Sequence, residues 1–191
     1  MVVEIVVLIC RTVGGLLISL CLLRLWLQYA RAASSNPIAT FTRTLTDWLV
    51  LPLRKVIPSV GALDMASLCG AWLVGWVLAV VMRFLLVIDS GLGLDIASLL
   101  IGALVQSVFL VVENSLMLCL ILVIGQALIS WINPHAPVAP VLNQLANPVL
   151  APVRRVLPRI GQLDLSPLVV ILLLQILNLV VSRAAMSVGL F

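Results

Sequence analysis

Four long apolar runs, separated by shorter polar stretches, dominate the pattern of hydrophobic and polar positions along the chain. The runs extend from about Val2 to Tyr29, from about Ala66 to Ile88, from Ile96 to Ile132, and from about Leu168 to Leu190. A helix needs roughly 20 mostly apolar residues to cross the hydrocarbon core of a bilayer. The pattern therefore predicts an all-α membrane protein with four transmembrane helices.

The third run is the most difficult to interpret, because it is too long for one crossing and too short for two. Gly102 and the polar pair of Glu113 and Asn114 offer places where a helix can break or surface. We expect a linker with a short interfacial or re-entrant segment over 89–107, followed by a span from about Val108 to Trp131. One continuous helix and two tight crossings are the alternatives.

Two shorter segments have the periodicity of helices that are apolar on one face only. The apolar positions are Ile38, Phe41, Leu45, Trp48 and Leu49 in the first segment, and Val138, Val141, Leu142, Leu145 and Val149 in the second. Each segment is too short to span and keeps a polar face, so we expect an interfacial amphipathic helix. Asn36 followed by Pro37 predicts the N-cap and first turn of the first helix.

A sequence motif occurs twice, 100 residues apart. Pro52-Leu-Arg-Lys-Val-Ile-Pro-Ser-Val-Gly-Ala-Leu-Asp64 aligns without a gap on Pro152-Val-Arg-Arg-Val-Leu-Pro-Arg-Ile-Gly-Gln-Leu-Asp164. Each copy follows an amphipathic segment and precedes a span, so the repeat unit is a span, an interfacial helix, a basic proline-bounded turn and a second span. We therefore expect a single membrane domain, 1–191, made of two parallel tandem hairpin repeats, about 1–88 and 108–191.

Composition and charge agree with this architecture and give it an orientation. The chain is 63% hydrophobic and 9% charged, whereas a soluble domain is about half apolar and a quarter charged. The loops 30–64 and 133–167 hold seven basic residues: Arg31, Arg43, Arg54, Lys55, Arg154, Arg155 and Arg159. The positive-inside rule therefore predicts a multi-pass inner-membrane protein with both long loops in the cytoplasm and both termini outside.

The duplicated motif resembles that of the YggT family of bacterial and plastid membrane proteins, also called YlmG, and the resemblance covers essentially the whole chain. Members of the family are linked to osmotic-stress tolerance and potassium uptake, to division or nucleoid distribution, and to haem attachment during cytochrome b6 assembly. The resemblance implies no shared enzymatic activity, so it mainly supports the architecture.

Several residues of the motif are expected to shape the turns and cap the following spans. These residues are Pro52, Pro58, Gly61, Asp64, Pro152, Pro158, Gly161 and Asp164. An aspartate before a helix accepts hydrogen bonds from free N–H groups and meets the positive end of the helix dipole. The alternative is an ion pair with Arg54 or Arg154 across the hairpin, and both roles are compatible.

The basic residues of the motif are candidates for contact with lipid or with a partner. Arg54, Lys55, Arg154 and Arg155 would lie just after the interfacial helices, where anionic headgroups attract each cation by about 1 kcal/mol. The alternative interpretation is a paired basic surface that docks an acidic membrane or cytoplasmic protein.

Charged residues inside the spans form a second candidate site. A charge at the bilayer centre costs about 2.5–3.5 kcal/mol, so such residues usually pair or reach toward the interface. Arg83 and Glu113 lie at comparable depth and are the preferred ion pair, with Arg11 as the next choice. A role in an ion pathway is the alternative.

The remaining residues give little support for catalysis or cofactor binding. His135 is the single histidine, and the four cysteines are scattered through the spans. We expect no metal, haem or other cofactor and no nucleic-acid partner. Small residues at four-residue spacing favour close packing within the chain over a homo-oligomer. The prediction is a non-enzymatic scaffold or assembly factor, with a small ion-handling protein as the alternative.

Overall fold

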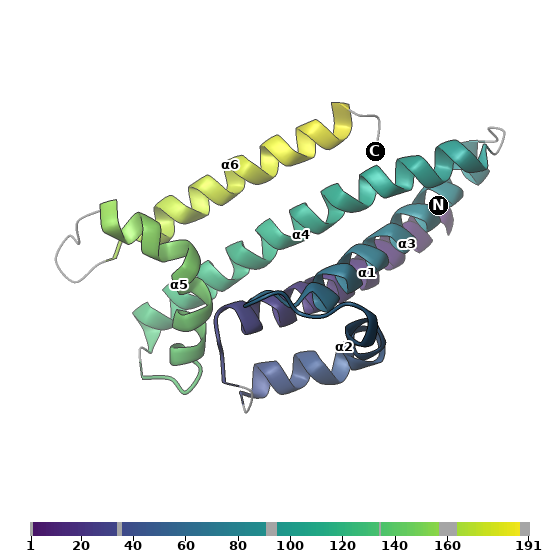
Figure 1. The fold of residues 1–191 in the computed structure, drawn as a ribbon. Coiled ribbons are helices and arrows are strands. Elements are labelled where there is room, and N and C mark those ends of the chain that lie inside the picture. Colours follow the sequence, from purple (N-terminus) through teal and green to yellow (C-terminus); the bar gives the residue numbers. More distant parts are fainter. Residues whose placement is uncertain (1, 34–35, 91–94, 134, 157–163, 188–191) are drawn as a thin grey trace.

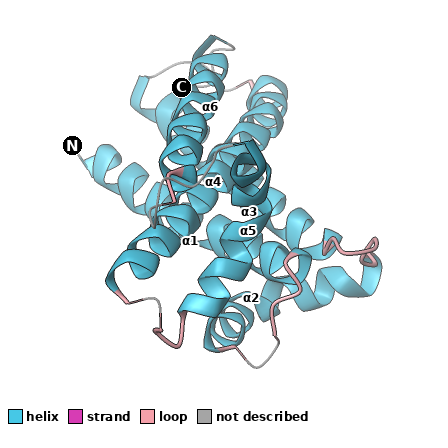
Figure 2. Cartoon of the chain, turned by 90° about the vertical axis from the view of Figure 1, so that its left-hand side faces the viewer, coloured by secondary structure: helices cyan, strands magenta, loops and turns pink. Residues whose placement is uncertain are grey.

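The computed structural model describes residues 2–33, 36–90, 95–133, 135–156 and 164–187. These residues form six helices: α1 (Val2–Tyr29), α2 (Pro37–Val56), α3 (Met65–Ser90), α4 (Ile96–Ile132), α5 (Ala139–Val156) and α6 (Ser166–Ser187). The described residues are coloured in Figure 2 as helices and loops only. Four helices, α1, α3, α4 and α6, are long and apolar enough to cross a membrane, which confirms the predicted all-helical chain with four candidate spans.

The helix α4 corrects the interpretation of the third run, because it continues for 37 residues without the break expected near residue 107. The polar side chains of Asn114 and Ser115 bond to the helix's own backbone and do not open it. Asn114 Nδ2 donates to the Leu110 carbonyl at 2.7 Å, and Ser115 Oγ donates to the Val111 carbonyl at 2.7 Å. Polar groups satisfied within one turn need no contact with water, so the helix continues through them.

The four long helices run in alternating directions and pack side by side (Figure 1). α1 and α4 run one way, and α3 and α6 run the opposite way. α3 packs between α1 and α4, and α6 packs on α4. The two shorter helices lie where α1 and α4 end, with α2 against α1 and α3, and α5 against α4 and α6. We call this the α2–α5 end of the molecule.

Small residues allow α3 to approach its neighbours closely. Ala71 and Ala79 are fully buried, and a Cβ atom placed on Gly75 would lie 3.5 Å from the Ser107 carbonyl of α4 and 3.7 Å from Ile18 of α1. These small residues are therefore used for packing within the chain.

The end of α1 is tied to α5. The Trp26 indole N–H donates to the Leu145 carbonyl at 2.8 Å, and Gln144 Nε2 donates to the Ala30 and Arg31 carbonyls at 2.9 and 3.1 Å. Leu27 and Leu145 pack in one buried apolar cluster. The first and second halves of the chain are thus joined at the α2–α5 end.

Candidate functional site

The basic residues of the motif lie within helices and not in a turn that follows them. The last turns of the two short helices hold Arg54 and Lys55 in α2, and Arg154 and Arg155 in α5. Pro52 and Pro152 also lie inside these helices. The predicted proline-bounded turn was therefore placed too early in the sequence, because its first proline and its basic residues are helical. Cations in the last turn are stabilised by the negative end of the helix dipole, and helix geometry therefore extends through them.

Between α2 and α3 the chain reverses direction through a short hairpin that follows Pro58. Val60 and Leu63 exchange two backbone hydrogen bonds of 3.1 and 3.0 Å. Gly61, at the first position between them, has φ of 59°. This is the left-handed region that a two-residue hairpin turn requires and that glycine adopts without steric cost. The hairpin returns the chain to Asp64 at the start of α3.

Asp64 is fully buried and is held by two side chains. Arg54 Nη2 donates to Asp64 Oδ2, and Ser67 Oγ donates to the same oxygen at 2.7 Å. The Ser67 N–H lies 3.4 Å from Asp64 Oδ1. The structure therefore brings Arg54 to Asp64 across the hairpin, and the same carboxylate contacts the first turn of α3. A buried carboxylate is stable only with such partners.

Arg24, which the sequence analysis did not single out, extends this arrangement into α1. Its side chain is only 8% exposed. Nη1 donates to Thr46 Oγ1 at 3.0 Å and to Asp47 Oδ1 at 2.7 Å, and Nε lies 3.9 Å from Asp64 Oδ2. We call Arg24, Thr46, Asp47, Arg54 and Asp64 the Arg24 cluster. The sequence did indicate Arg24 as a candidate site residue, because it is a charged residue inside an apolar run, as Arg11 is.

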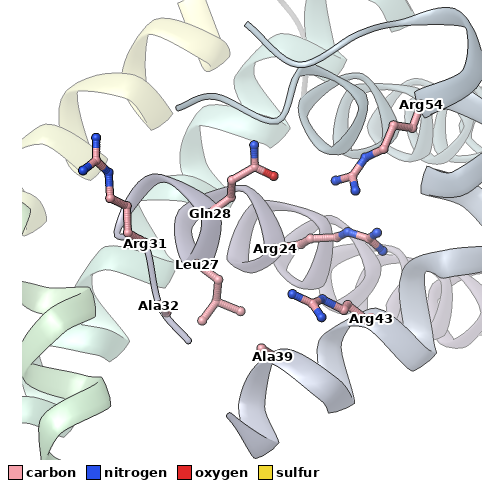
Figure 3. Close-up of a pocket in the computed structure, with 8 residues that line it drawn as sticks. All are labelled: Arg24, Leu27, Gln28, Arg31, Ala32, Ala39, Arg43 and Arg54. Carbon is pink, nitrogen blue, oxygen red and sulfur yellow. The ribbon is translucent and has the colours of Figure 1, made fainter. Parts of the chain in front are cut away.

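A pocket of about 320 Å³ lies beside the Arg24 cluster (Figure 3). It is lined by Arg24, Leu27, Gln28, Arg31, Ala32, Ala39, Arg43 and Arg54. Figure 3 shows the guanidinium groups of Arg24, Arg43 and Arg54 gathered on one side, whereas Arg31 points away from them. The pocket is therefore strongly basic.

The second copy of the motif also pairs its arginine with its aspartate, but in a more open setting. Arg154 Nε donates to Asp164 Oδ2 at 2.8 Å, and the Ser166 N–H donates to Asp164 Oδ1 at 3.0 Å. Burial alone would raise the pKa of Asp164, but the hydrogen bonds from Ser166 and Arg154 outweigh it and hold this pKa below its ordinary value. Pro158 and Gly161 lie outside the described residues.

The contact between α4 and α5 uses neutral amides. The corresponding contact in the first half of the chain, between α1 and α2, uses charged groups. Gln126 Nε2 donates to Asn143 Oδ1 at 2.9 Å, and Asn143 lies 100 positions after Arg43. The two halves therefore share the arginine–aspartate pair of the motif but differ in the charge of the helix contact beside it.

Arg83 does not pair with Glu113, contrary to the preferred expectation. Its Nε donates to Gln106 Oε1 at 2.9 Å, and its guanidinium lies against Gly102. A Cβ atom at Gly102 would lie 2.4 Å from Arg83 Nη1. Gly102 thus provides room for the arginine and does not break α4. Comparing the membrane depths of charged residues could not predict the contact between Arg83 and Gln106, because Gln106 is uncharged.

Arg11 and Glu113 both line a cleft of about 440 Å³ away from the α2–α5 end. Its lining comes mainly from α1, α4 and α6: Arg11, Gly15, Leu78, Leu110, Glu113, Asn114, Met117, Asn178 and Ser182. Arg11 and Glu113 form no salt bridge within 4 Å in the part of the chain that the structure describes. They share this polar cleft without direct contact.

Metal-binding side chains do not cluster in the described ranges, where no three His, Cys, Asp or Glu residues gather. Cys10, Cys21, Cys69 and Cys119 are free thiols. The chemistry available at the described sites is therefore that of cations, amides and carboxylates.

Comparisons with known proteins agree with the fold. The CCB3/YggT family profile matches residues 3–87 and 105–185. The uncharacterized protein YggT of Escherichia coli K12 is 36% identical over 183 residues, 93% of this chain and 89% of its own length. An uncharacterized protein of Vibrio alginolyticus, encoded in the proC 3' region, is 35% identical over 87% of this chain and 88% of its own length.

A third relative, an uncharacterized protein of Haemophilus influenzae, is 35% identical over 82% of this chain and 80% of its own length. No solved structure matches the chain. The family profile covers both halves, and these relatives align over most of their lengths. The chain therefore belongs to the CCB3/YggT family.

Proposed function

We propose that this multi-pass membrane protein is a non-enzymatic scaffold or assembly factor that recruits an acidic protein partner at its α2–α5 end. The observation that carries the proposal is the position of the motif's basic residues, which occupy the last turns of α2 and α5. These two helices lie at the same end of the long helices. Binding residues are commonly presented on connecting segments by a rigid frame.

The basic residues divide into two groups by their contacts. Arg54 and Arg154 bond to Asp64 and Asp164. Lys55 and Arg155 are exposed and form no ion pair with any residue in the described ranges. We assign recruitment to Lys55 and Arg155, while Arg54 and Arg154 stabilise the local structure that presents them.

The proposal includes a cytoplasmic α2–α5 end, which the basic residues of the loops favour. Reporter fusions after Ser59 and after His135 test this orientation. Both fusions should be active only with a cytoplasmic reporter. An extracytoplasmic signal from one position alone would refute the parallel arrangement of the two halves, and such a signal from both positions would refute the cytoplasmic orientation.

Recruitment is tested by comparing the Lys55→Gln/Arg155→Gln double variant with an Arg183→Gln variant, which removes a cation near the end of α6. The unmodified protein and the two variants are purified from crosslinked membranes, and each protein recovered with them is quantified. The recovered amount of one partner protein should fall with the double variant and stay unchanged with the control. That partner should bind the purified chain with a salt-sensitive Kd. Equal recovery from all three proteins would contradict the proposal.

A small ion-handling protein is the second candidate, because the cleft between α1, α4 and α6 holds Arg11, Glu113, Asn178 and Ser182. An ion-binding site needs polar groups within the span, and this cleft supplies them. The buried apolar residues Ile18, Cys21 and Leu22 lie further along α1, so the polar cleft does not extend along that helix.

Ion flux into reconstituted vesicles separates the two candidates. Under the scaffold proposal the protein produces no selective flux, and Glu113→Gln changes nothing in this assay. A selective flux that Glu113→Gln abolishes and Gln126→Leu leaves intact would establish ion handling instead.

A further inference from the structure

We propose that the basic pocket formed by Arg24, Arg43, Arg54 and Gln28 is a binding site for a single phosphate group. Two sources share this chemistry: the headgroup of an anionic phospholipid and a soluble phosphate. The inference does not rest on the recruitment of a partner by Lys55 and Arg155. It concerns a different surface, between the end of α1 and α2.

The charge balance of the pocket favours an anion. The three arginines of the proposed site, Arg24, Arg43 and Arg54, are contacted within the described ranges by two carboxylates, those of Asp47 and Asp64. These side chains therefore carry one positive charge in excess, and Arg31, which also lines the pocket, adds a second. Apolar neighbours such as Leu27 and Ala39 lower the local dielectric, so the excess charge attracts an anion more strongly than it would in water.

The pocket also retains free hydrogen-bond donors. A guanidinium has five N–H donors. Arg24 uses Nη1 for Thr46 and Asp47, and Arg54 uses Nη2 for Asp64. Arg43 is exposed and forms no ion pair within the described ranges. The unused donors match phosphate oxygens, which arginine binds in a bidentate geometry.

The Arg24 cluster holds part of this site in place before a ligand binds. Arg24 is nearly buried and is bonded to two residues of α2, while Arg54 is bonded to Asp64. Side chains that are already fixed lose little conformational entropy when they bind. Arg43 is exposed and unpaired, so it is the group best suited to close over the anion, and it is the residue to test.

The second half of the chain provides a matched control. Asn143 lies 100 positions after Arg43 and bonds to Gln126. Arg183 of α6 is an exposed arginine, like Arg43, and it belongs neither to the pocket lining nor to the residues assigned to recruitment. Replacing Arg183 removes the same charge without touching the pocket.

The experiment measures the Kd of the purified full chain in detergent for three probes: short-chain phosphatidylglycerol, inorganic phosphate and short-chain phosphatidylcholine. Each is titrated into the unmodified protein, Arg43→Gln and Arg183→Gln. The Tm of each protein without ligand checks that it is folded. Arg43→Gln should raise the Kd for the anionic probe about tenfold or more, because a charge-assisted hydrogen bond is lost. Arg183→Gln should leave the Kd unchanged.

Tighter binding of phosphatidylglycerol than of inorganic phosphate would assign the site to a lipid headgroup, and equal binding would assign it to a soluble phosphate. Either result supports the site if it depends on Arg43. Equal weakening by Arg43→Gln and Arg183→Gln would overturn the proposal, because it would show a general electrostatic attraction. Absence of saturable binding by both anionic probes, or equal binding of phosphatidylcholine, would overturn it as well.

Discussion

Asp64 and Asp164 occupy the same position in the two copies of the motif, yet their surroundings differ. The side chain of Asp64 is fully buried, whereas that of Asp164 is 27% exposed. Both accept hydrogen bonds from an arginine ten residues earlier, but only Asp64 has a second arginine, Arg24, within 4 Å among the described residues. Similar local sequence thus forms the same pair, and the neighbouring helix decides whether the pair becomes part of the core.

The largest expected effect separates the two aspartates. Asp64→Asn removes a fully buried carboxylate from buried Arg24 and from the partly exposed Arg54, and it should reduce the free energy of unfolding by about 3–5 kcal/mol. Asp164→Asn should cost about 1 kcal/mol, because the ion pair that it breaks joins the partly exposed side chains of Arg154 and Asp164. Reversible denaturation in mixed micelles measures both values. Similar losses in the two variants would show that burial does not distinguish the copies.

The next prediction concerns the helix contact beside each pair. Arg24→Met removes hydrogen bonds to Thr46 and Asp47 and should destabilise the protein by about 2–3 kcal/mol. Gln126→Leu should be close to neutral, because Gln126 Oε1 is buried without a partner in the described structure and exposed Asn143 can bond to water instead. Both variants are compared by Tm and by denaturation. A larger loss from Gln126→Leu would reverse the comparison.

Two glycines of α4 test whether the first half is also more tightly packed along this helix. A Cβ atom at Gly102 would displace the Arg83 guanidinium, whereas one at Gly125 would lie 3.9 Å from Leu142. Gly102→Ala should therefore lose the bond to Gln106, at a cost of about 1 kcal/mol. Gly125→Ala should stabilise the protein by up to about 1 kcal/mol through helix propensity. The free energies of unfolding should thus change with opposite sign, and changes of the same sign would contradict the packing argument.

The smallest expected effect is a pH dependence of the second copy. The hydrogen bonds from Ser166 and Arg154 lower the pKa of Asp164 in the folded state, so the stabilisation is complete above the unfolded-state pKa. It is lost as the pH falls through the lower, folded-state pKa. Hydrogen exchange of the Ser166 amide should therefore accelerate on acidification, relative to exchange in Asp164→Asn at the same pH. An identical pH profile in the variant would exclude this linkage.

Local interactions in this chain were predictable from the sequence. The Asn36 side chain accepts a hydrogen bond from the Ile38 N–H at the start of α2, which confirms the expected N-cap. The arginine–aspartate pairs of the motif join residues only ten positions apart, so their spacing within a hairpin was enough to suggest them. Such contacts depend mainly on nearby residues.

Contacts between distant helices were not predictable in the same way. Arg24 of α1 forms an ion pair with Asp47 of α2, and Arg83 donates a hydrogen bond to Gln106 instead of pairing with Glu113. These choices depend on the rotation of each helix about its axis, and an all-round apolar helix gives no periodic signal for that rotation. The continuity of α4 was missed for a related reason, since a polar side chain that bonds to its own helix has the same sequence signature as a break.

The length of α4 has a consequence for the surrounding lipid. A helix of 37 residues is about 55 Å long at 1.5 Å per residue, while the hydrocarbon core is about 30 Å thick. Even a tilt of about 40°, the upper end of the usual range, leaves a projection of about 42 Å along the membrane normal. This positive hydrophobic mismatch of about 12 Å thickens the adjacent bilayer or carries apolar turns of α4 into the headgroup layer, so the protein favours thick membrane regions over thin ones.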